Sequence, residues 1–212
     1  MFHQQTQKDI SMNNNKSIIV LYGNSNVGKT STLQQMIIRL CGGSKLIPTI
    51  QSAFESIFLT VNSHGKHYYK DANVILSYKG HNIFVSTGGD TWAKVRGNFD
   101  FMRNITDPKN VYVFHNGSFE IFENLKSQEQ EMFRECSVFV TAASLSPYGA
   151  FEAAKHFTTG RAREFHCEAW VRKEKSKQSP FIDKYKRVRK SDDVYAEKII
   201  KVIDRIISGD II

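Results

Sequence analysis

The chain has 212 residues and a mass of 24.3 kDa, which is enough to bury a full hydrophobic core in one domain. Its hydrophobic content is 41%, its charged content is 24% and its net charge is +8, and its three cysteines form no C-x-x-C pair. This cysteine usage argues against a disulfide scaffold and a cysteine-based zinc site, and it favours a reducing compartment. Because no apolar stretch approaches the roughly 18 residues of a membrane span and no signal-peptide core is present, we expect a cytoplasmic protein without a membrane partner.

The first 16 residues are polar, rich in Gln and Asn, and without hydrophobic periodicity. Such a composition predicts a disordered polar tail, because it offers too little apolar surface to offset the entropy lost when a chain is ordered. We expect residues 17–212 to form a single domain, which begins with an apolar run at 18–21.

Directly after this run, residues 21–32 read LYGNSNVGKTST. Residues 23–30 fit the pattern G-x-x-x-x-G-K-[ST], and a helical segment at 33–40 follows, so the motif has the strand–loop–helix context of a phosphate-binding loop. The glycines let backbone N–H groups wrap closely around a polyphosphate, and the helix N-terminus attracts its negative charge. Lys29 is expected to reach the outer phosphates, and Thr30 to bind a Mg²⁺ ion that bridges them. The residues predicted to bind a nucleoside triphosphate are Gly23, Asn24, Ser25, Asn26, Val27, Gly28, Lys29, Thr30 and Ser31.

The next elements are predicted from helix-ending and turn-forming residues and from hydrophobic periodicity. The segment CGGS at 41–44 predicts the end of the first helix, and a mixed connection with a short helix near 50–58 follows. Two β-rich runs at 74–76 and 83–85, separated by a short glycine-containing turn, are typical of a hairpin. The terminal helix is amphipathic, and Ser191 and Asp192 are expected to cap its start. Periodicity further predicts helices at 92–105, 119–135, 150–157 and 191–208, and strands at 111–114, 137–141 and 168–172.

Helices that alternate with strands predict an α/β fold of three layers, in which a mostly parallel sheet is covered by helices on both faces. The hairpin adds one antiparallel strand, which we expect at the edge of the sheet. In such sheets ligands bind at the carboxyl ends of the parallel strands, and the glycine-rich loop lies at one of these ends.

The loop GNSNVGKTST and the order of the elements resemble the P-loop NTPase superfamily, and the hairpin after the first helix is similar to Ras-like and translation-factor-type GTPases. In that class a threonine about twenty residues beyond the loop lysine closes over Mg²⁺ and the γ-phosphate. Thr49 has this spacing from Lys29, so the resemblance implies that both residues act in catalysis. The sequence STGG at 86–89 stands where the class carries Asp-x-x-Gly.

Two departures restrict what this resemblance implies. Ser86 replaces the family's aspartate, so Asp90 is the next carboxylate that could hold Mg²⁺ or orient a water for catalysis, although it could also be a simple turn aspartate. The guanine-reading motif Asn-Lys-x-Asp is absent, and residues 142–144, where it is expected, read Ala-Ala-Ser. Guanine selectivity is therefore not implied, and ATP is favoured over GTP.

Positive charge is concentrated between residues 155 and 190, where twelve Lys and Arg residues outnumber four Asp and Glu residues. This basic segment could bind nucleic acid or an acidic partner, or it could be a solvated face of the domain. Within it, Arg161 and Arg163 could close over the phosphates as the lid of a kinase, or they could be surface cations.

Three functions are compatible with these residues. The first is Mg²⁺-dependent binding and hydrolysis of ATP, coupled to a conformational switch. The second is transfer of a phosphoryl group to a small molecule or nucleotide beneath an arginine-bearing lid. The third is a nucleotide-binding module with little turnover that recruits a partner through the basic segment. Each of the three is compatible with an oligomer.

Overall fold

The computed structural model describes residues 16–103, 110–159, 165–174 and 190–210, and of residues 43–48 and 190–191 it describes the backbone alone. The predicted tail therefore lies, except for Lys16, outside the described residues. The strands are β1 (Ser17–Gly23), β2 (Leu59–Val61), β3 (His67–Tyr69), β4 (Asn73–Tyr78), β5 (His81–Ser86), β6 (Val111–His115), β7 (Ser118–Ile121), β8 (Cys136–Ser144) and β9 (His166–Arg172). The helices are α1 (Lys29–Phe58), α2 (Trp92–Met102), the 3₁₀ turn η1 (Phe122–Asn124), α3 (Ser127–Arg134), α4 (Ala150–Thr158) and α5 (Lys190–Ser208). Among the helices of the described ranges, none combines the length and the apolar character that a membrane span requires.

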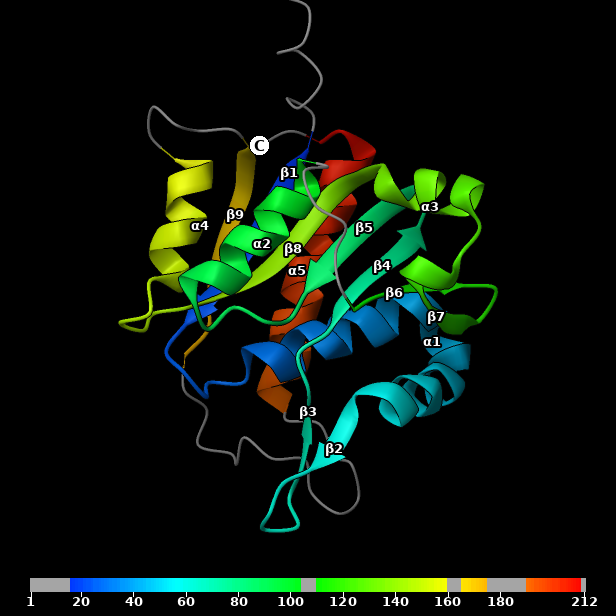
Figure 1. The fold of residues 1–212 in the computed structure, drawn as a ribbon, viewed down its shortest axis with the longest axis horizontal. Coiled ribbons are helices and arrows are strands. Elements are labelled where there is room, and N and C mark those ends of the chain that lie inside the picture. The colour runs from blue at the N-terminus through cyan, green and yellow to red at the C-terminus, as the bar shows by residue number, and fades with distance from the viewer. Residues whose placement is uncertain (1–15, 104–109, 160–164, 175–189, 211–212) are drawn as a thin grey trace, which may run out of the picture.

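Seven strands form one sheet in the order β7-β6-β4-β5-β8-β1-β9, and β2 pairs with β3 in a separate small sheet (Figure 1). Four neighbouring pairs of the large sheet are parallel and two, β4–β5 and β6–β7, are antiparallel. The predicted α/β class with a mostly parallel sheet is thus confirmed. The predicted hairpin is confirmed as well, because Val74 of β4 lies opposite Val85 of β5. Its expected position at the sheet edge is wrong, since β6 and β7 extend the sheet beyond β4.

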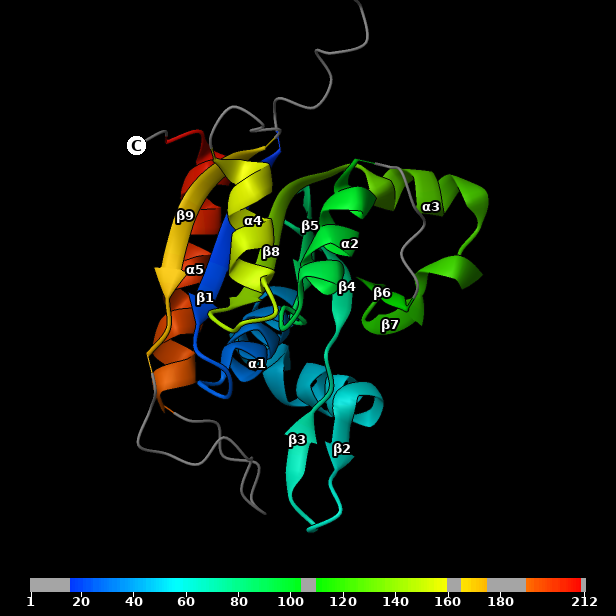
Figure 2. The same ribbon diagram turned by 60° about the vertical axis from the view of Figure 1, so that its left-hand side comes forward.

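Helices cover both faces of the large sheet. The alternation of side chains along β1 places Ile19 and Leu21 in one hydrophobic cluster with α1 and α5, and Ile18 and Val20 in another with α2 and α4. Figures 1 and 2 show these helix pairs on opposite sides of the strands. All four side chains are fully buried, and each such burial stabilises the fold by about 1.5–3 kcal/mol.

Helix α1 does not end at 41–44, so that prediction is wrong: the helix continues to Phe58 and bends between its two halves (Figure 1). Its second half includes the predicted short helix at 50–58. Phe54 and Phe58 hold this half against the far edge of the sheet. Their rings lie 5.6 Å from Phe119 and 4.9 Å from Tyr112, respectively. This aromatic packing outweighs the weak helix propensity of the two glycines at 42 and 43.

The predicted helix at 119–135 is also wrong in its first part, where the chain forms β7 and η1 before α3 begins at Ser127. Asn116 and Gly117 both have positive φ, at 49° and 80°, which is the geometry of a two-residue hairpin turn between β6 and β7. Phe119 then lies opposite Phe114 in the antiparallel ladder and packs against α1. The Asn-Gly pair was the local signal that could have identified this hairpin.

Candidate functional site

The carboxyl ends of three adjacent parallel strands, β5, β8 and β1, carry loops that meet at one edge of the sheet. Two backbone hydrogen bonds join these loops. The Leu145 amide donates to the Gly23 carbonyl over 2.9 Å, and the Ser144 amide donates to the Gly89 carbonyl over 2.7 Å. The glycine-rich loop at 23–30, the segment 86–91 and the end of β8 therefore form one continuous structure.

Two residues of the glycine-rich loop have a left-handed backbone conformation. Gly28 has a φ of 90° and precedes the first residue of α1, and Asn26 also has a positive φ of 61°. At Gly23 an added Cβ would overlap the carbonyl oxygen of Lys173, so only glycine fits between the loop and the end of β9. The first turn of α1 contains no acidic side chain, which leaves the positive end of its dipole directed at the loop.

Lys29 is folded over the loop as a buried cation. Its side chain is 6% exposed, and Nζ donates to the carbonyl oxygens of Gly23 and Asn24 over 3.2 and 2.9 Å. Burial lowers the pKa of the Lys29 ammonium below its ordinary value, whereas the charges of Asp90 and Asp71 oppose this change. The ammonium is thus held by carbonyl oxygens of its own loop, beside two carboxylates that favour its charged form.

Thr30 connects the loop to the segment after β5. Its hydroxyl donates to the Thr87 carbonyl over 3.4 Å. Thr87 in turn exchanges two hydrogen bonds with Ala72, through its amide over 2.9 Å and its side-chain oxygen over 2.7 Å. A displacement at Thr30 can therefore reach both the segment 86–91 and the start of β4.

Asp90 lies next to the loop because the chain approaches β8 closely at Gly89, where a Cβ would overlap the Ala142 carbonyl. The Ser144 hydroxyl donates to Asp90 Oδ1 over 2.7 Å, and the Ser146 hydroxyl donates to the Asp90 carbonyl over 3.3 Å. Asp90 itself is exposed. The structure thus brings Asp90, Lys29 and Thr30 to one edge of the sheet.

Asp71 is a residue of this edge that the sequence analysis missed. A Cβ added at Gly88 would lie 3.0 Å from Asp71 Oδ2, and Lys94 Nζ is 2.7 Å from the same oxygen. The sequence indicates the position of Asp71 only indirectly, through the predicted hairpin. Because β4 runs antiparallel to β5, with Asn73 opposite Ser86, the residues before β4 must lie beside those that follow β5.

Behind the loop, a buried ion pair joins three elements. Lys173 and Asp192 are 0% and 1% exposed at their side chains, and Lys173 Nζ is 2.7 Å from Asp192 Oδ1. The Thr32 hydroxyl of α1 donates to the same oxygen over 3.2 Å. The Lys173 amide also donates to the Tyr22 carbonyl over 2.7 Å. Asp192, predicted as a helix cap, lies in the first turn of α5 and connects this helix with the end of β9 and with the first turn of α1.

Other predicted residues lie elsewhere. Thr49 is exposed on the second half of α1, five residues before Phe54, whose ring packs against Phe119 of the edge strand β7. None of the hydrogen bonds or ring contacts of the described residues joins Thr49 to the glycine-rich loop. Ser86 is buried, and its hydroxyl turns back to the Gly88 carbonyl over 3.4 Å. Arg161 and Arg163, together with residues 160–164 and 175–189 of the basic segment, lie outside the described residues.

The oxygen donors at this edge suit Mg²⁺. Mg²⁺ in nucleotide sites takes one or two protein oxygens and keeps water and phosphate oxygens as its other ligands. The Thr30 hydroxyl and the Asp90 carboxylate are of this type. Within the described ranges, no group of three or more His, Cys, Asp or Glu residues could hold a metal by protein ligands alone.

Comparisons with protein-family models, with curated proteins and with solved structures returned no match. The function must therefore be inferred from the residues of this chain.

Proposed function

We propose that the chain is a P-loop NTPase that binds a nucleoside triphosphate with Mg²⁺ at residues 23–31 and hydrolyses it. The arrangement of Lys29 carries this proposal. A lysine that is 94% buried, since its exposure is 6%, stands over a helix N-terminus and hydrogen-bonds two loop carbonyls. Phosphate oxygens would replace these neutral carbonyl acceptors with negatively charged ones, so that each hydrogen bond of the ammonium would also become an ion pair.

Each polar residue of the edge has a role in this proposal. Lys29 and the backbone amides of the loop would hold the phosphates. Thr30 and Asp90 would hold Mg²⁺, which would supply positive charge next to the transferring phosphoryl group. Ser144 fixes the Asp90 carboxylate in place. ATP is proposed over GTP because Asn-Lys-x-Asp is absent after β8.

A nucleotide-driven switch is supported by the contacts of Thr87. Thr30 donates to the Thr87 carbonyl, so a Thr30 hydroxyl that turns to Mg²⁺ gives up this bond. The segment 86–91 then loses one of its connections to α1, while its two hydrogen bonds with Ala72 remain. Segment 86–91 and the start of β4 are thus the part that would move with the nucleotide state.

A binding module with little turnover is the second candidate, and one observation favours it. The strand end that carries an aspartate in the related class carries Ser86 here, and its hydroxyl is buried and directed at its own turn. The exposed Asp90 must then supply the carboxylate alone or with Asp71. The hypothesis of a kinase with an arginine-bearing lid remains a prediction, since Arg161 and Arg163 lie outside the described residues.

The test is binding and phosphate release with ATP and GTP in the presence of Mg²⁺, for the native chain and for Lys29→Ala. A matched control is Lys79→Ala, which removes a half-exposed lysine paired with Asp204 across a different part of the fold. We expect Lys29→Ala to lose binding and turnover and Lys79→Ala to keep both. Binding without phosphate release in the native chain would support the binding module, and no binding at all would refute the proposal.

A further inference from the structure

Residues 59–70 form a two-stranded ribbon, β2–β3, that projects from the body of the domain in both views (Figures 1 and 2). Its two strands pair only with each other among the described strands. An isolated two-stranded hairpin is marginally stable in water, so this ribbon depends on its root. From the sequence, these residues are predicted to belong to a mixed connection.

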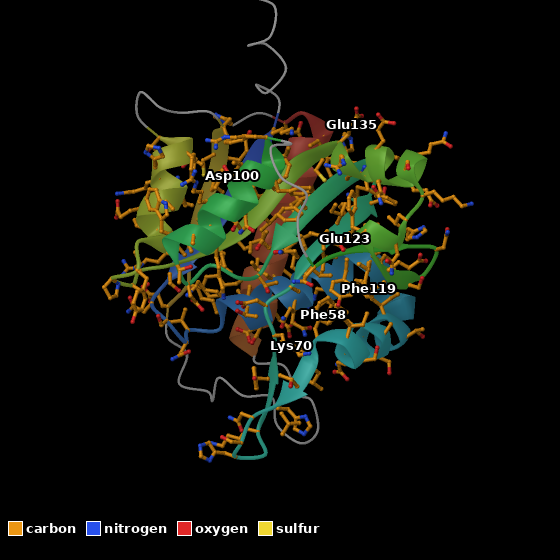
Figure 3. The ribbon with its side chains drawn as sticks, in the orientation of Figure 1. Phe58, Lys70, Asp100, Phe119, Glu123 and Glu135 are labelled. Atoms are coloured by element: carbon orange, nitrogen blue, oxygen red, sulfur yellow. The ribbon has the colours of Figure 1, made fainter. Side chains whose placement is uncertain are left out.

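The root of the ribbon is firmly held. Tyr69 is 7% exposed, and its ring lies 5.8 Å from that of Phe54. The Lys70 amide donates to the Phe58 carbonyl over 2.9 Å, and Gln34 Nε2 of α1 donates to the Lys70 carbonyl over 2.8 Å. Figure 3 labels Phe58 and Lys70 at this junction. The tip is therefore presented at a defined position relative to the glycine-rich loop.

The ribbon combines cations with exposed apolar side chains. Residues 56–70 contain no Asp or Glu, and they carry Lys66 and Lys70, both exposed, together with two histidines. Because side chains alternate along β3, Tyr69 faces the core while Tyr68 faces solvent and is 39% exposed. Val61, on the facing strand, is 52% exposed. A solvated hairpin does not need an exposed tyrosine between two lysines, as Tyr68 stands between Lys66 and Lys70 along this strand.

We propose that the β2–β3 ribbon binds single-stranded nucleic acid. Lys66 and Lys70 contact backbone phosphates, and the ring of Tyr68 stacks on a base. Cations beside an exposed aromatic ring are the combination by which proteins bind single strands without reading their sequence. The positive charge of the ribbon is complementary to the phosphates of a nucleic acid.

The ribbon is also joined to the proposed nucleotide site. Lys70 is the first residue after β3, and Asp71 is the second. Asp71 lies beside Gly88 and forms an ion pair with Lys94. Ala72 then exchanges two hydrogen bonds with Thr87. A strand bound at the ribbon is thus connected to segment 86–91, and we expect it to stimulate hydrolysis; this expectation, unlike the binding itself, rests on the proposed function.

The test measures fluorescence anisotropy of a labelled oligothymidylate of about 30 nucleotides, which exceeds the site sizes of roughly 4–16 nucleotides known for single-strand binders. Lys66→Ala/Lys70→Ala is compared with Lys198→Ala/Lys201→Ala, a pair of exposed lysines on α5 with the same change of charge. The ribbon variant should weaken binding, and its plot of log affinity against log salt should be shallower by about 1.4, at roughly 0.7 per lost phosphate contact. The α5 variant should bind like the native chain.

Tyr68 gives a second, independent measurement. Tyr68→Ala should weaken binding roughly five- to a hundredfold, whereas Tyr68→Phe, which keeps the ring, should bind normally. Equal oligonucleotide affinities of the ribbon and α5 double variants would overturn the proposal. The ribbon would then either pair with a strand of a protein partner or remain solvated. Tighter binding of the matching duplex than of the single strand would overturn the assignment to single strands.

The two proposals can fail separately. Ribbon-dependent binding that persists in Lys29→Ala, in a chain that hydrolyses no nucleotide, would uphold the ribbon and refute the NTPase. If hydrolysis depends on Lys29 but the ribbon variants bind the oligonucleotide like the native chain, the NTPase proposal would be upheld and the ribbon proposal refuted. Where both proposals hold, the oligothymidylate should raise phosphate release in the native chain and in Lys198→Ala/Lys201→Ala, but not in Lys66→Ala/Lys70→Ala.

Discussion

The hydroxyl of Ser144, at the end of β8, donates a 2.7 Å hydrogen bond to the carboxylate of Asp90, which follows β5. Ser144 is fully buried and its amide donates to the Gly89 carbonyl, whereas Asp90 is exposed. A rigid strand end therefore fixes the orientation of a carboxylate that would otherwise be mobile. In the proposed NTPase this carboxylate faces the metal and the phosphates, so its orientation should matter for turnover rather than for binding.

Ser144→Ala tests this relationship. A hydrogen bond to a charged group contributes about 1.5–3 kcal/mol, so loss of the hydroxyl should lower kcat roughly ten- to a hundredfold. The Kd for ATP should change little, because Lys29 and the loop amides hold the phosphates. Ser146→Ala is the control, since that hydroxyl contacts the Asp90 carbonyl and not the carboxylate. Equal kcat values for the two variants would show that Asp90 needs no support from β8.

The buried position of Lys29 predicts a dependence on pH. Burial lowers its pKa below the ordinary 10.5, mainly through desolvation, while Asp90 and Asp71 act in the opposite direction. Between the lowered pKa and 10.5 the unfolded chain binds the proton and the folded chain does not, so Lys29 should contribute a stability that rises with pH over this window. Urea unfolding of the native chain and of Lys29→Met across this range isolates this contribution: the slope of stability against pH should be less positive, or more negative, in Lys29→Met. Equal slopes in the two proteins would contradict a lowered pKa at Lys29.

Binding of ATP should show the opposite trend. Phosphates require the charged ammonium, so ATP affinity should fall as pH rises through the lowered pKa of Lys29, and binding at that pH should take up protons. Calorimetric titration in buffers with different ionisation enthalpies measures this uptake. An affinity that stays constant up to the ordinary pKa of lysine would show that Lys29 does not meet the phosphates.

Three glycines predict a contrast in stability. A Cβ at Gly23 would overlap the Lys173 carbonyl and one at Gly89 would overlap the Ala142 carbonyl, and these backbone atoms cannot move aside cheaply. Gly23→Ala and Gly89→Ala should each cost about 1–3 kcal/mol. Gly97→Ala, inside α2 with open space around it, should instead stabilise the fold by about 0.5–1 kcal/mol. Urea denaturation of all three variants provides the comparison.

The ion pair behind the loop should behave as a unit. Lys173→Met removes the ammonium that lies 2.7 Å from the buried Asp192 carboxylate, which should cost about 3–5 kcal/mol of the free energy of unfolding. Lys173→Met/Asp192→Asn removes both charges and keeps an oxygen for the Thr32 hydroxyl, so it should recover much of this loss. A double-mutant cycle by urea unfolding measures the coupling. Additive losses in the cycle would contradict a specific pairing.

The fold was predictable where local patterns and final packing agree. The hairpin β4–β5 and strands such as β8 follow from runs of β-branched and aromatic residues, and α5 follows from its amphipathic periodicity. The failures have tertiary causes. Helix α1 passes the glycines at 42 and 43 because Phe54 and Phe58 pack on β6 and β7, and β7 forms from helix-compatible residues because Phe119 completes that aromatic cluster.

The candidate site was predictable only where a motif encodes it. Residues 23–30 form one contiguous pattern, so Lys29 and Thr30 could be named from the sequence. Asp71 and the Lys173–Asp192 pair could not, because their partners are distant in the chain and their positions follow from strand order. Asp90 is an intermediate case. Its position just after β5 could be predicted from the sequence, but its hydrogen bond with Ser144 could not, because Ser144 belongs to a different strand, β8.

For Thr49, the family resemblance and the structure lead to different expectations. The resemblance implies a role in catalysis, whereas the structure places Thr49 on the second half of α1. Thr30→Ala should reduce kcat/KM roughly a hundredfold or more, with a higher requirement for Mg²⁺, because it removes a metal ligand in the proposed site. Thr49→Ala should change kcat/KM by no more than about twofold, since Thr49 is exposed on the second half of α1, five residues before Phe54. Steady-state phosphate release with varied Mg²⁺ distinguishes the two. If both variants lose activity alike, Thr49 must reach the γ-phosphate, and α1 must open between its halves when nucleotide binds.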